Sequence, residues 1–158
     1  MATVDDLSLL ERRKIEAGVL VPLIRAFQAE FGEARVNELV AKTIRGIAAA
    51  QGAAVRERSR IETIGDLKAR MKAGPIAEGS LIVDVVEDDD VRFGFNVTRC
   101  KFVEMYNEMG AGDLGFLLSC NRDFASFEAM APDLAFDRTQ TRMQGAPHCD
   151  FRYAVKAE

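Results

Sequence analysis

The sequence predicts an α+β fold in which N-terminal helices pack on a small antiparallel sheet, with further helices between a first hairpin and the C-terminal strands. Apolar residues recur at helical spacing through the first 75 residues. From residue 80 they alternate with polar residues, which is typical of strands with one buried face. Helical spacing returns over residues 101–130, and two alternating runs follow. Helices and strands therefore occupy separate stretches of the chain, as in an α+β domain.

Residues 8–31 are predicted to form one long helix. Ser8 and Glu11 have the spacing of a capping box, in which each side chain accepts a backbone N–H of the other residue. Gly32 follows the last apolar position and is expected to end the helix. A proline lies inside this helix and cannot donate a backbone hydrogen bond, so we expect a kink over residues 18–22. The defining apolar positions are Leu9, Leu10, Ile15, Val19, Leu20, Leu23, Ile24, Phe27 and Phe31.

A second helix is predicted over residues 33–54, where apolar residues again recur at helical spacing. The basic run at 56–60 is expected to be a solvent-exposed connector, because charge runs usually face water. Thr63 and Asp66 form another capping pattern, and this short helix is predicted to end at Gly74.

The first strands are predicted over residues 80–86 and 91–98, with the acidic residues 87–90 forming a turn between them. The alternation favours an antiparallel hairpin whose apolar face packs on the helices. The spacing of an EF-hand calcium loop is absent from the acidic segment, so a solvated turn is the preferred interpretation.

Three short helices are predicted after this hairpin. The first covers residues 101–109 and ends before a glycine. Asp113 is expected to cap a second helix over residues 114–118, and Asp123 is expected to cap a third over residues 124–130.

The last two strands are predicted over residues 134–143 and 148–155, joined by a turn at 144–147. With 158 residues, of which 48% are hydrophobic, the chain can bury the core of one domain. We therefore expect a single domain over residues 1–158, with a helical part over 1–75 and a second part over 80–155.

The charge balance argues against a nucleic-acid partner. Twenty-five acidic residues outnumber 21 basic ones, which leaves a net charge of -4 and no positive field for phosphates. The first residues carry two aspartates where a signal peptide would be positively charged, and no run approaches the ~18 apolar residues of a membrane span. An odd number of cysteines suits a reducing compartment. We expect a cytoplasmic protein that does not bind membranes.

Cysteines are the first candidates for chemistry. Cys100 lies at a predicted strand-to-helix junction, where a helix N-terminus would lower the pKa of its thiol. Cys120 and Asp123 are three residues apart, so a continuous helical turn would place them on one face. Each cysteine could be a nucleophile, or it could be a small apolar residue of the core.

Alternation divides the last predicted strand into two faces. Cys149 shares its face with the aromatic residues that should be buried, whereas His148, Asp150 and Arg152 lie on the other face. His148 could be a general base or an exposed residue without a role. Arg138 and Arg152 could hold a substrate carboxylate, or pair with neighbouring aspartates. A zinc site would need cysteines from distant segments; the cofactor is therefore unknown, and a divalent metal stays open.

An ordered series of motifs runs through roughly residues 80–155. The motifs are Thr98-Arg99-Cys100, Tyr106-Asn107-Glu108-Met109-Gly110, Leu114-Gly115, Cys120-Asn121-Arg122-Asp123, Arg138-Thr139-Gln140-Thr141, and Gly145 followed by Cys149-Asp150-Phe151-Arg152-Tyr153. This series resembles the L-2-amino-thiazoline-4-carboxylic acid hydrolase family. The resemblance implies a hydrolase that opens a carbon–nitrogen bond in a small cyclic amidine or thiazoline ring, in the named case forming an N-carbamoyl cysteine. The family pattern falls on Cys100, Cys120, Asp123, Arg138, Cys149, Asp150 and Arg152, and we expect Arg99 and Asn121, in the same motifs, to assist substrate binding.

Two hypotheses follow for the function. In the first, a cysteine attacks the ring carbon or binds a metal that activates water; the order of preference is Cys120, then Cys100 or Cys149. Asp123 would be the base, and His148 or Asp150 would be the proton donor. In the second, the chain is a non-catalytic module that binds a small molecule or a metal, because the order of elements is also similar to the vinyl-reductase-type small-molecule-binding fold. The two long helices carry more apolar residues than a small sheet can cover, so a homo-oligomer is also expected.

Overall fold

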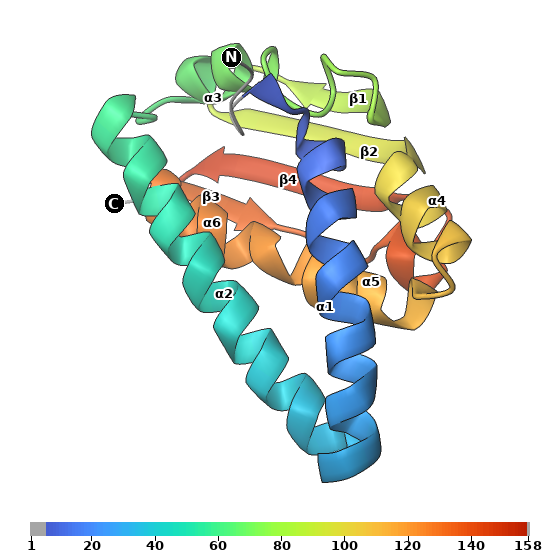
Figure 1. Cartoon of the computed structure of the whole chain (residues 1–158). Coiled ribbons are helices and arrows are strands. Elements are labelled where there is room, and N and C mark those ends of the chain that lie inside the picture. Colours follow the sequence, from blue (N-terminus) through green and yellow to red (C-terminus); the bar gives the residue numbers. More distant parts are fainter. Residues whose placement is uncertain (1–5, 158) are drawn as a thin grey trace.

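A four-stranded antiparallel sheet, with the order β1-β2-β4-β3, lies in the upper half of Figure 1. The structure is a computed structural model that describes residues 6–157; residues 1–5 and 158 of the expected domain lie outside the described residues. The N-terminal helices and the sheet confirm the predicted α+β class. The strands are β1 (Leu81–Asp88), β2 (Arg92–Cys100), β3 (Leu134–Asp137) and β4 (Cys149–Val155).

Helix α1 (Leu9–Phe31) begins with the predicted capping box. The Ser8 hydroxyl accepts the backbone N–H of Glu11 at 3.2 Å, and the Glu11 carboxylate accepts the backbone N–H of Ser8 at 2.8 Å. The helix continues through Pro22 and ends at Gly32, whose φ of +87° lies in the left-handed region that glycine tolerates. In Figure 1, α1 and α2 form a V that closes at this turn.

Helix α2 (Glu33–Arg58) is longer than predicted. The first three residues of the basic run at 56–60 belong to it, so the expectation of a connector there was wrong for these residues. Arginine and glutamate are good helix formers, and basic side chains in the last turn interact well with the helix dipole. Helix α3 (Ile64–Met71) begins with the predicted capping box of Thr63 and Asp66.

The first hairpin is confirmed, and β1 pairs with β2 in antiparallel register. Its turn is shorter than predicted, because β1 continues through Asp88. The Asp89 carboxylate accepts the backbone N–H groups of Val91 and Arg92 at 2.8 and 2.6 Å. These two bonds form the turn that the acidic segment was expected to make.

The three short helices occur in the predicted order, but two aspartates do not cap them. Asp113 lies inside its helix and pairs with Arg25 of α1 at 2.7 Å. Asp123 is the first residue of its helix and pairs with Arg138. In both cases an arginine from another segment binds the carboxylate that was expected to cap the helix. The helices are α4 (Lys101–Glu108), α5 (Gly112–Leu118) and α6 (Asp123–Met130), with the 3-10 turn η2 (Cys120–Arg122) before α6.

The third strand ends at Asp137, six residues earlier than predicted. After it the chain leaves the sheet and forms a 3-10 turn, η3 (Arg142–Gln144). The Asp150 carboxylate accepts the backbone N–H groups of Thr139 and Gln140 at 3.0 and 2.9 Å. These N–H groups therefore bind a side chain instead of a neighbouring strand.

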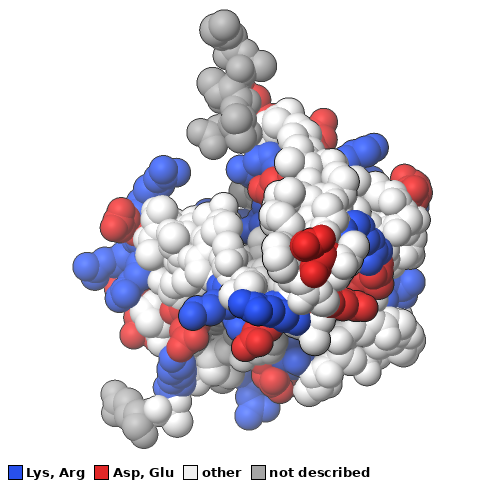
Figure 2. Space-filling view, turned by 60° about the horizontal axis from the view of Figure 1, so that its bottom comes forward, with Lys and Arg blue, Asp and Glu red and all other residues white. Residues whose placement is uncertain are grey.

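Two groups of buried side chains hold the layers together. One lies between the sheet, α3 and α6, and the other lies between α1, α2, α4 and α5. Within the described residues no helix is both long and apolar enough to span a bilayer. Large apolar side chains nevertheless remain exposed on α1 and α2. Figure 2 brings the closed end of the V forward and shows broad areas without charged residues there. The exposed apolar side chains are Ile15, Val19, Leu23, Phe27, Phe31, Leu39 and Ile47.

Candidate active site

A cavity of about 330 Å³ lies beside the buried side chains that join the sheet to α6. Its walls come from α1, α2, α6, β2 and β4, together with the ends of the neighbouring segments. The rings of Phe95 and Phe151 stack at 5.1 Å between centroids and continue through Phe136, whose ring lies 5.5 Å from Phe151. A small planar ring could stack on such a wall. The aromatic lining residues are Phe95, Phe102, Phe127, Phe136, Phe151 and Tyr153.

All three cysteines and Asp123 line this cavity. Cys100 is the N-cap residue of α4, Cys120 begins η2, and Cys149 is the first residue of β4. The sheet explains part of this convergence, because Cys149 lies directly opposite Val97 of β2. Residues far apart in the sequence are thus brought to one site beside a carboxylate.

The environment of the thiols keeps them protonated. Burial raises the pKa of Cys100, although the backbone N–H groups of Val103 and Phe102 oppose it. Burial and then the charge of Asp123 raise the pKa of Cys120 far above its ordinary value. Burial also raises the pKa of Cys149, whose sulfur accepts the backbone N–H of Arg142 at 3.2 Å. At the helix N-terminus, the pKa of the Cys100 thiol was expected to be lowered. It is raised instead, because desolvation of the thiolate outweighs the favourable effect of the helix dipole.

We predict that the native protein reacts slowly with iodoacetamide at pH 7. The thiolate is the reacting form, so each thiol with a raised pKa should react at least about tenfold more slowly than free cysteine. Labelling followed by peptide mass spectrometry measures each site, with the guanidinium-unfolded chain as the control in which all three cysteines react. A single cysteine that is labelled rapidly in the native protein would contradict this prediction and restore the thiolate mechanism.

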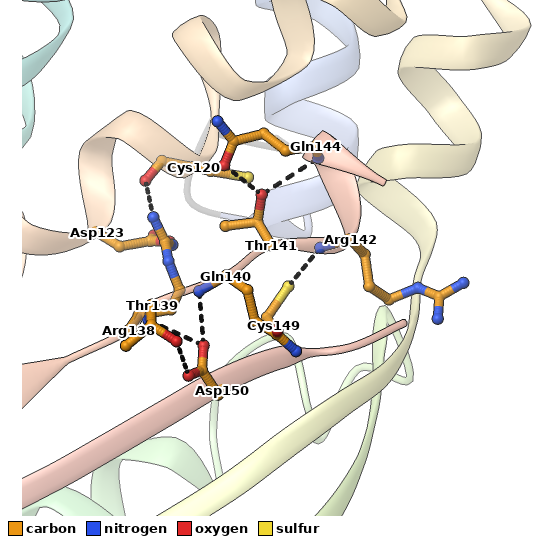
Figure 3. Close-up of polar contacts among 10 residues, drawn as sticks. All are labelled: Cys120, Asp123, Arg138, Thr139, Gln140, Thr141, Arg142, Gln144, Cys149 and Asp150. Carbon is orange, nitrogen blue, oxygen red and sulfur yellow. Dashed lines mark hydrogen bonds and ion pairs between the residues drawn. The ribbon is translucent and has the colours of Figure 1, made fainter. Parts of the chain in front are cut away.

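Asp123 and Arg138 form the charged pair of the cavity, which Figure 3 shows with its neighbours. The Arg138 guanidinium also donates to the backbone carbonyl of Cys120 at 3.2 Å and lies 5.4 Å from the ring centre of Phe124. Only 4% of the Arg138 side chain is exposed, whereas 35% of the Asp123 side chain is exposed because it faces the cavity. Burial raises the pKa of Asp123 to about 6, although the charge and hydrogen bond of Arg138 lower it.

Two further arginines, Arg13 and Arg122, line the cavity and were not predicted as site residues. Arg13 donates to both carboxylate oxygens of Glu16 at 2.8 Å, and Arg122 reaches the same carboxylate at 3.3 Å. Two cations therefore share one anion, and Nη1 of Arg122 is buried without a hydrogen-bond partner among the described residues. The sequence carries one signal for Arg13, which lies at helical spacing between the apolar residues Leu9 and Ala17.

Asp150 and His148 lie outside the cavity lining. The Asp150 carboxylate is held by Thr139 and Gln140 (Figure 3). Burial would raise the pKa of Asp150, but these hydrogen bonds outweigh it and lower the pKa. The backbone carbonyl of His148 accepts the side-chain amide of Gln140 at 3.0 Å.

The other expected substrate-binding residues, except Arg138, also lie away from the cavity. Arg152 donates to the backbone carbonyl of Phe95 at 3.0 Å and to the side chain of Asn96 at 2.9 Å. Asn121 donates to the carbonyl of Ala41 and so joins η2 to α2. Arg99 pairs with Glu104 at 2.7 Å on the surface. Each of these side chains has a visible structural partner.

A metal site was left open by the sequence. Among the described residues, no three or more His, Cys, Asp or Glu side chains come together in a way that could hold a metal ion. The three thiols and Asp123 share a cavity, but they do not form such a group.

A family model supplies the assignment of this chain. The model of the L-2-amino-thiazoline-4-carboxylic acid hydrolase family matches residues 12–153. The chain belongs to this family. The match covers nearly the whole chain. It therefore includes the N-terminal helices and extends well beyond the resemblance over residues 80–155. The cavity itself is built from both parts, because Arg13 comes from α1 and Asp123 from α6.

Comparisons with curated sequences and with solved structures do not extend this assignment. A search of curated protein sequences finds no match to the chain. The phenol-responsive sensory domain of the transcription activator PoxR, solved with phenol, is 13% identical over 86% of this chain and 72% of that one, with a TM-score of 0.49. A trafficking protein particle complex subunit 3 from Naegleria fowleri, covalently bound to palmitic acid, is 11% identical over 92% of this chain and 96% of that one, with a TM-score of 0.48. Likenesses at this level establish neither a shared ligand nor a shared function.

Proposed function

We propose that this family member hydrolyses a small cyclic amidine or thiazoline ring that carries a carboxylate, with Asp123 as the general base. One observation carries the proposal: a carboxylate with a pKa of about 6 faces a cavity of about 330 Å³ lined by aromatic rings. A general base works best when its pKa lies near the operating pH. Most Asp123 side chains are therefore ionised at pH 7 and ready to accept a proton.

In the proposed reaction a water molecule adds to the amidine carbon of the ring. Asp123 takes one proton from the water as its oxygen bonds to this carbon. The tetrahedral adduct then expels a ring heteroatom, and the proton moves from Asp123 to that leaving atom. The second proton of the water passes from the hydroxyl of the adduct to the nitrogen of the former C=N bond as the carbonyl forms. For an aminothiazoline acid, an N-carbamoyl cysteine product requires the carbon–sulfur bond to break; in other cyclic amidines the leaving atom is nitrogen. The net change is the addition of one water, and Asp123 is regenerated.

The arginines of the cavity position the base and bind the substrate carboxylate. Arg138 is committed to Asp123 and to the carbonyl of Cys120, so we assign it the positioning of the base. Nη1 of Arg122 is buried and has no hydrogen-bond partner among the described residues, and Arg122 and Arg13 share the carboxylate of Glu16. A substrate carboxylate placed there would supply the missing hydrogen-bond acceptor and charge. Arg122 with Arg13 therefore takes the anchoring role first expected of Arg138 and Arg152.

The cysteines act in this proposal as protonated residues of the cavity wall. A nucleophilic thiolate at Cys120 would have to form against burial and against the charge of Asp123. Cys100 and Cys149 meet the same obstacle of burial. Water activated by Asp123 needs no such ionisation. We expect Cys120→Ala and Cys149→Ala to change the fit of the ring more than the chemistry.

The proposal predicts a specific pH profile. Asp123 must be ionised to act, so kcat/KM should be constant above pH 7 and should fall about tenfold per pH unit well below pH 6. Turnover is measured with an aminothiazoline carboxylic acid, the same ring without its carboxylate, and a hydantoin. Loss of the carboxylate should raise KM by at least about tenfold. Activity that rises as the pH falls through 6 would exclude Asp123 as the base.

The alternative is a module that binds the ring without turnover. It is favoured by the ion pair of Asp123 with Arg138, since this pair restrains the only acidic side chain among the described residues that line the cavity. Calorimetry with the same compounds separates the two functions. Binding of the carboxylate-bearing ring with no product after prolonged incubation would support the module and reject the hydrolase.

A further inference from the structure

A second hollow, a groove of about 870 Å³, lies between α1 and α2 and opens to solvent. Its walls are apolar apart from Glu16, Arg35, Thr43 and Arg122. Val19 and Leu23 of α1 face Leu39 and Ile47 of α2 across it, and all four side chains are exposed. Contiguous apolar surface on this scale typically marks an interaction site.

The exposed residues of α1 form one regular row, which we call the α1 row: Ile15, Val19, Leu23, Phe27 and Phe31. Each is between 45% and 66% exposed, and each lies four residues after the last. Residues at this spacing make a ridge along a helix.

We propose that the groove is the interface of a two-fold symmetric homodimer, in which the α1 row of each copy lies against the groove of the other. The exposed part of the α1 row, with Leu39 and Ile47, amounts to roughly 700 Å² of apolar surface per copy. A standard stable interface buries about 800 Å² per partner. The available surface therefore matches what a dimer of this chain needs.

The order of side chains along the row fits a two-fold axis at Leu23. In an antiparallel pair centred on this residue, Ile15 lies opposite Phe31 of the second copy, and Val19 lies opposite Phe27. A smaller side chain thus meets a larger one in each of these layers, as interdigitated packing requires. In a parallel pair the phenylalanines would meet each other and leave the smaller side chains with a gap.

Sedimentation equilibrium of the full chain at about 1–100 µM tests the dimer, because interfaces of this size commonly give micromolar or tighter affinity. We expect a mass of twice 17.4 kDa. Leu23→Glu places two like charges at the axis and should weaken association at least about 100-fold. Val91→Glu adds the same charge at a residue that is 57% exposed but lies outside the groove, and it should leave the dimer intact.

Disulfide trapping tests the register without destabilising the interface. Under mild oxidation Leu23→Cys should give a cross-linked pair, because the two copies meet at this residue. Ile15→Cys should not, since in the proposed register its two copies lie 16 residues apart along the helix, or about 24 Å. A monomer at every concentration, a dimer that survives Leu23→Glu, or cross-linking of Ile15→Cys as fast as of Leu23→Cys would each overturn the proposal.

Discussion

Asp123→Asn is expected to lower kcat/KM about 10²- to 10⁴-fold, the usual contribution of a general base. Asparagine has the same shape as aspartate and can still accept the hydrogen bond that Arg138 donates to Asp123. It cannot take a proton from water. The loss should therefore fall mainly on kcat, and the remaining activity should no longer change near pH 6, where Asp123 titrates. Steady-state kinetics between pH 5 and 8 measure both effects.

Asp137→Asn is the matched control for this change. Asp137 is the exposed last residue of β3, next to Arg138, but it does not line the cavity. The same loss of a carboxylate there should alter kcat/KM by less than about threefold, as surface substitutions usually do. Circular dichroism checks that both variants keep the fold. An Asp123→Asn enzyme with full activity would refute the proposed base.

Local sequence signals were enough to predict most of the helices and strands. The capping boxes at Ser8 and Thr63 each involve residues only three apart, so their hydrogen bonds form within one turn of chain. Alternation along residues 91–98 identified the face of β2 that carries the buried Phe95 and Val97. Such patterns need no knowledge of the rest of the molecule. The structure departs from these local patterns where a distant segment supplies a stronger binding partner for a side chain.

The aspartates illustrate this limit. A cap was the correct local expectation for Asp113 and Asp123, but each carboxylate instead binds an arginine from another segment. Arg25 lies 88 residues from Asp113, and Arg138 lies 15 residues from Asp123. A cap and an arginine both give the carboxylate charge-assisted hydrogen bonds, but the arginine also brings a full positive charge, and Arg25 donates to both oxygens of Asp113. No pattern within one helix could have revealed them.

The site itself was predicted in part. The family motifs indicated Cys100, Cys120, Asp123 and Cys149, all of which line the cavity. The direction of the thiol pKa shifts could not be read from the motifs, because desolvation depends on which segments close around each sulfur. Arg122, although part of a motif, was not among the predicted site residues. Its role depends on Arg13 and Glu16, which lie more than 100 residues earlier in the chain.

Gly52→Ala is expected to lower the free energy of unfolding by about 1–3 kcal/mol. Gly52 is buried where α2 packs on α6, and a Cβ atom there would lie 2.2 Å from the backbone carbonyl oxygen of Ser126. Backbone cannot rotate away as a side chain can, so α6 would have to move. Because α6 begins with Asp123 and lines the cavity, turnover should fall together with stability. Urea unfolding and kcat/KM measure the two effects.

The same substitution at Gly46, two turns earlier in α2, should have the opposite sign. Gly46 is exposed, and a Cβ atom there would meet nothing within 4 Å. Alanine is about 1 kcal/mol better than glycine inside a helix, so Gly46→Ala should raise the free energy of unfolding by up to about that amount. Gly52→Ala would gain the same helical preference, and its net loss therefore measures the clash with α6. Equal effects at both positions would mean that α6 adapts freely, and that its contact with α2 does not hold Asp123 in place.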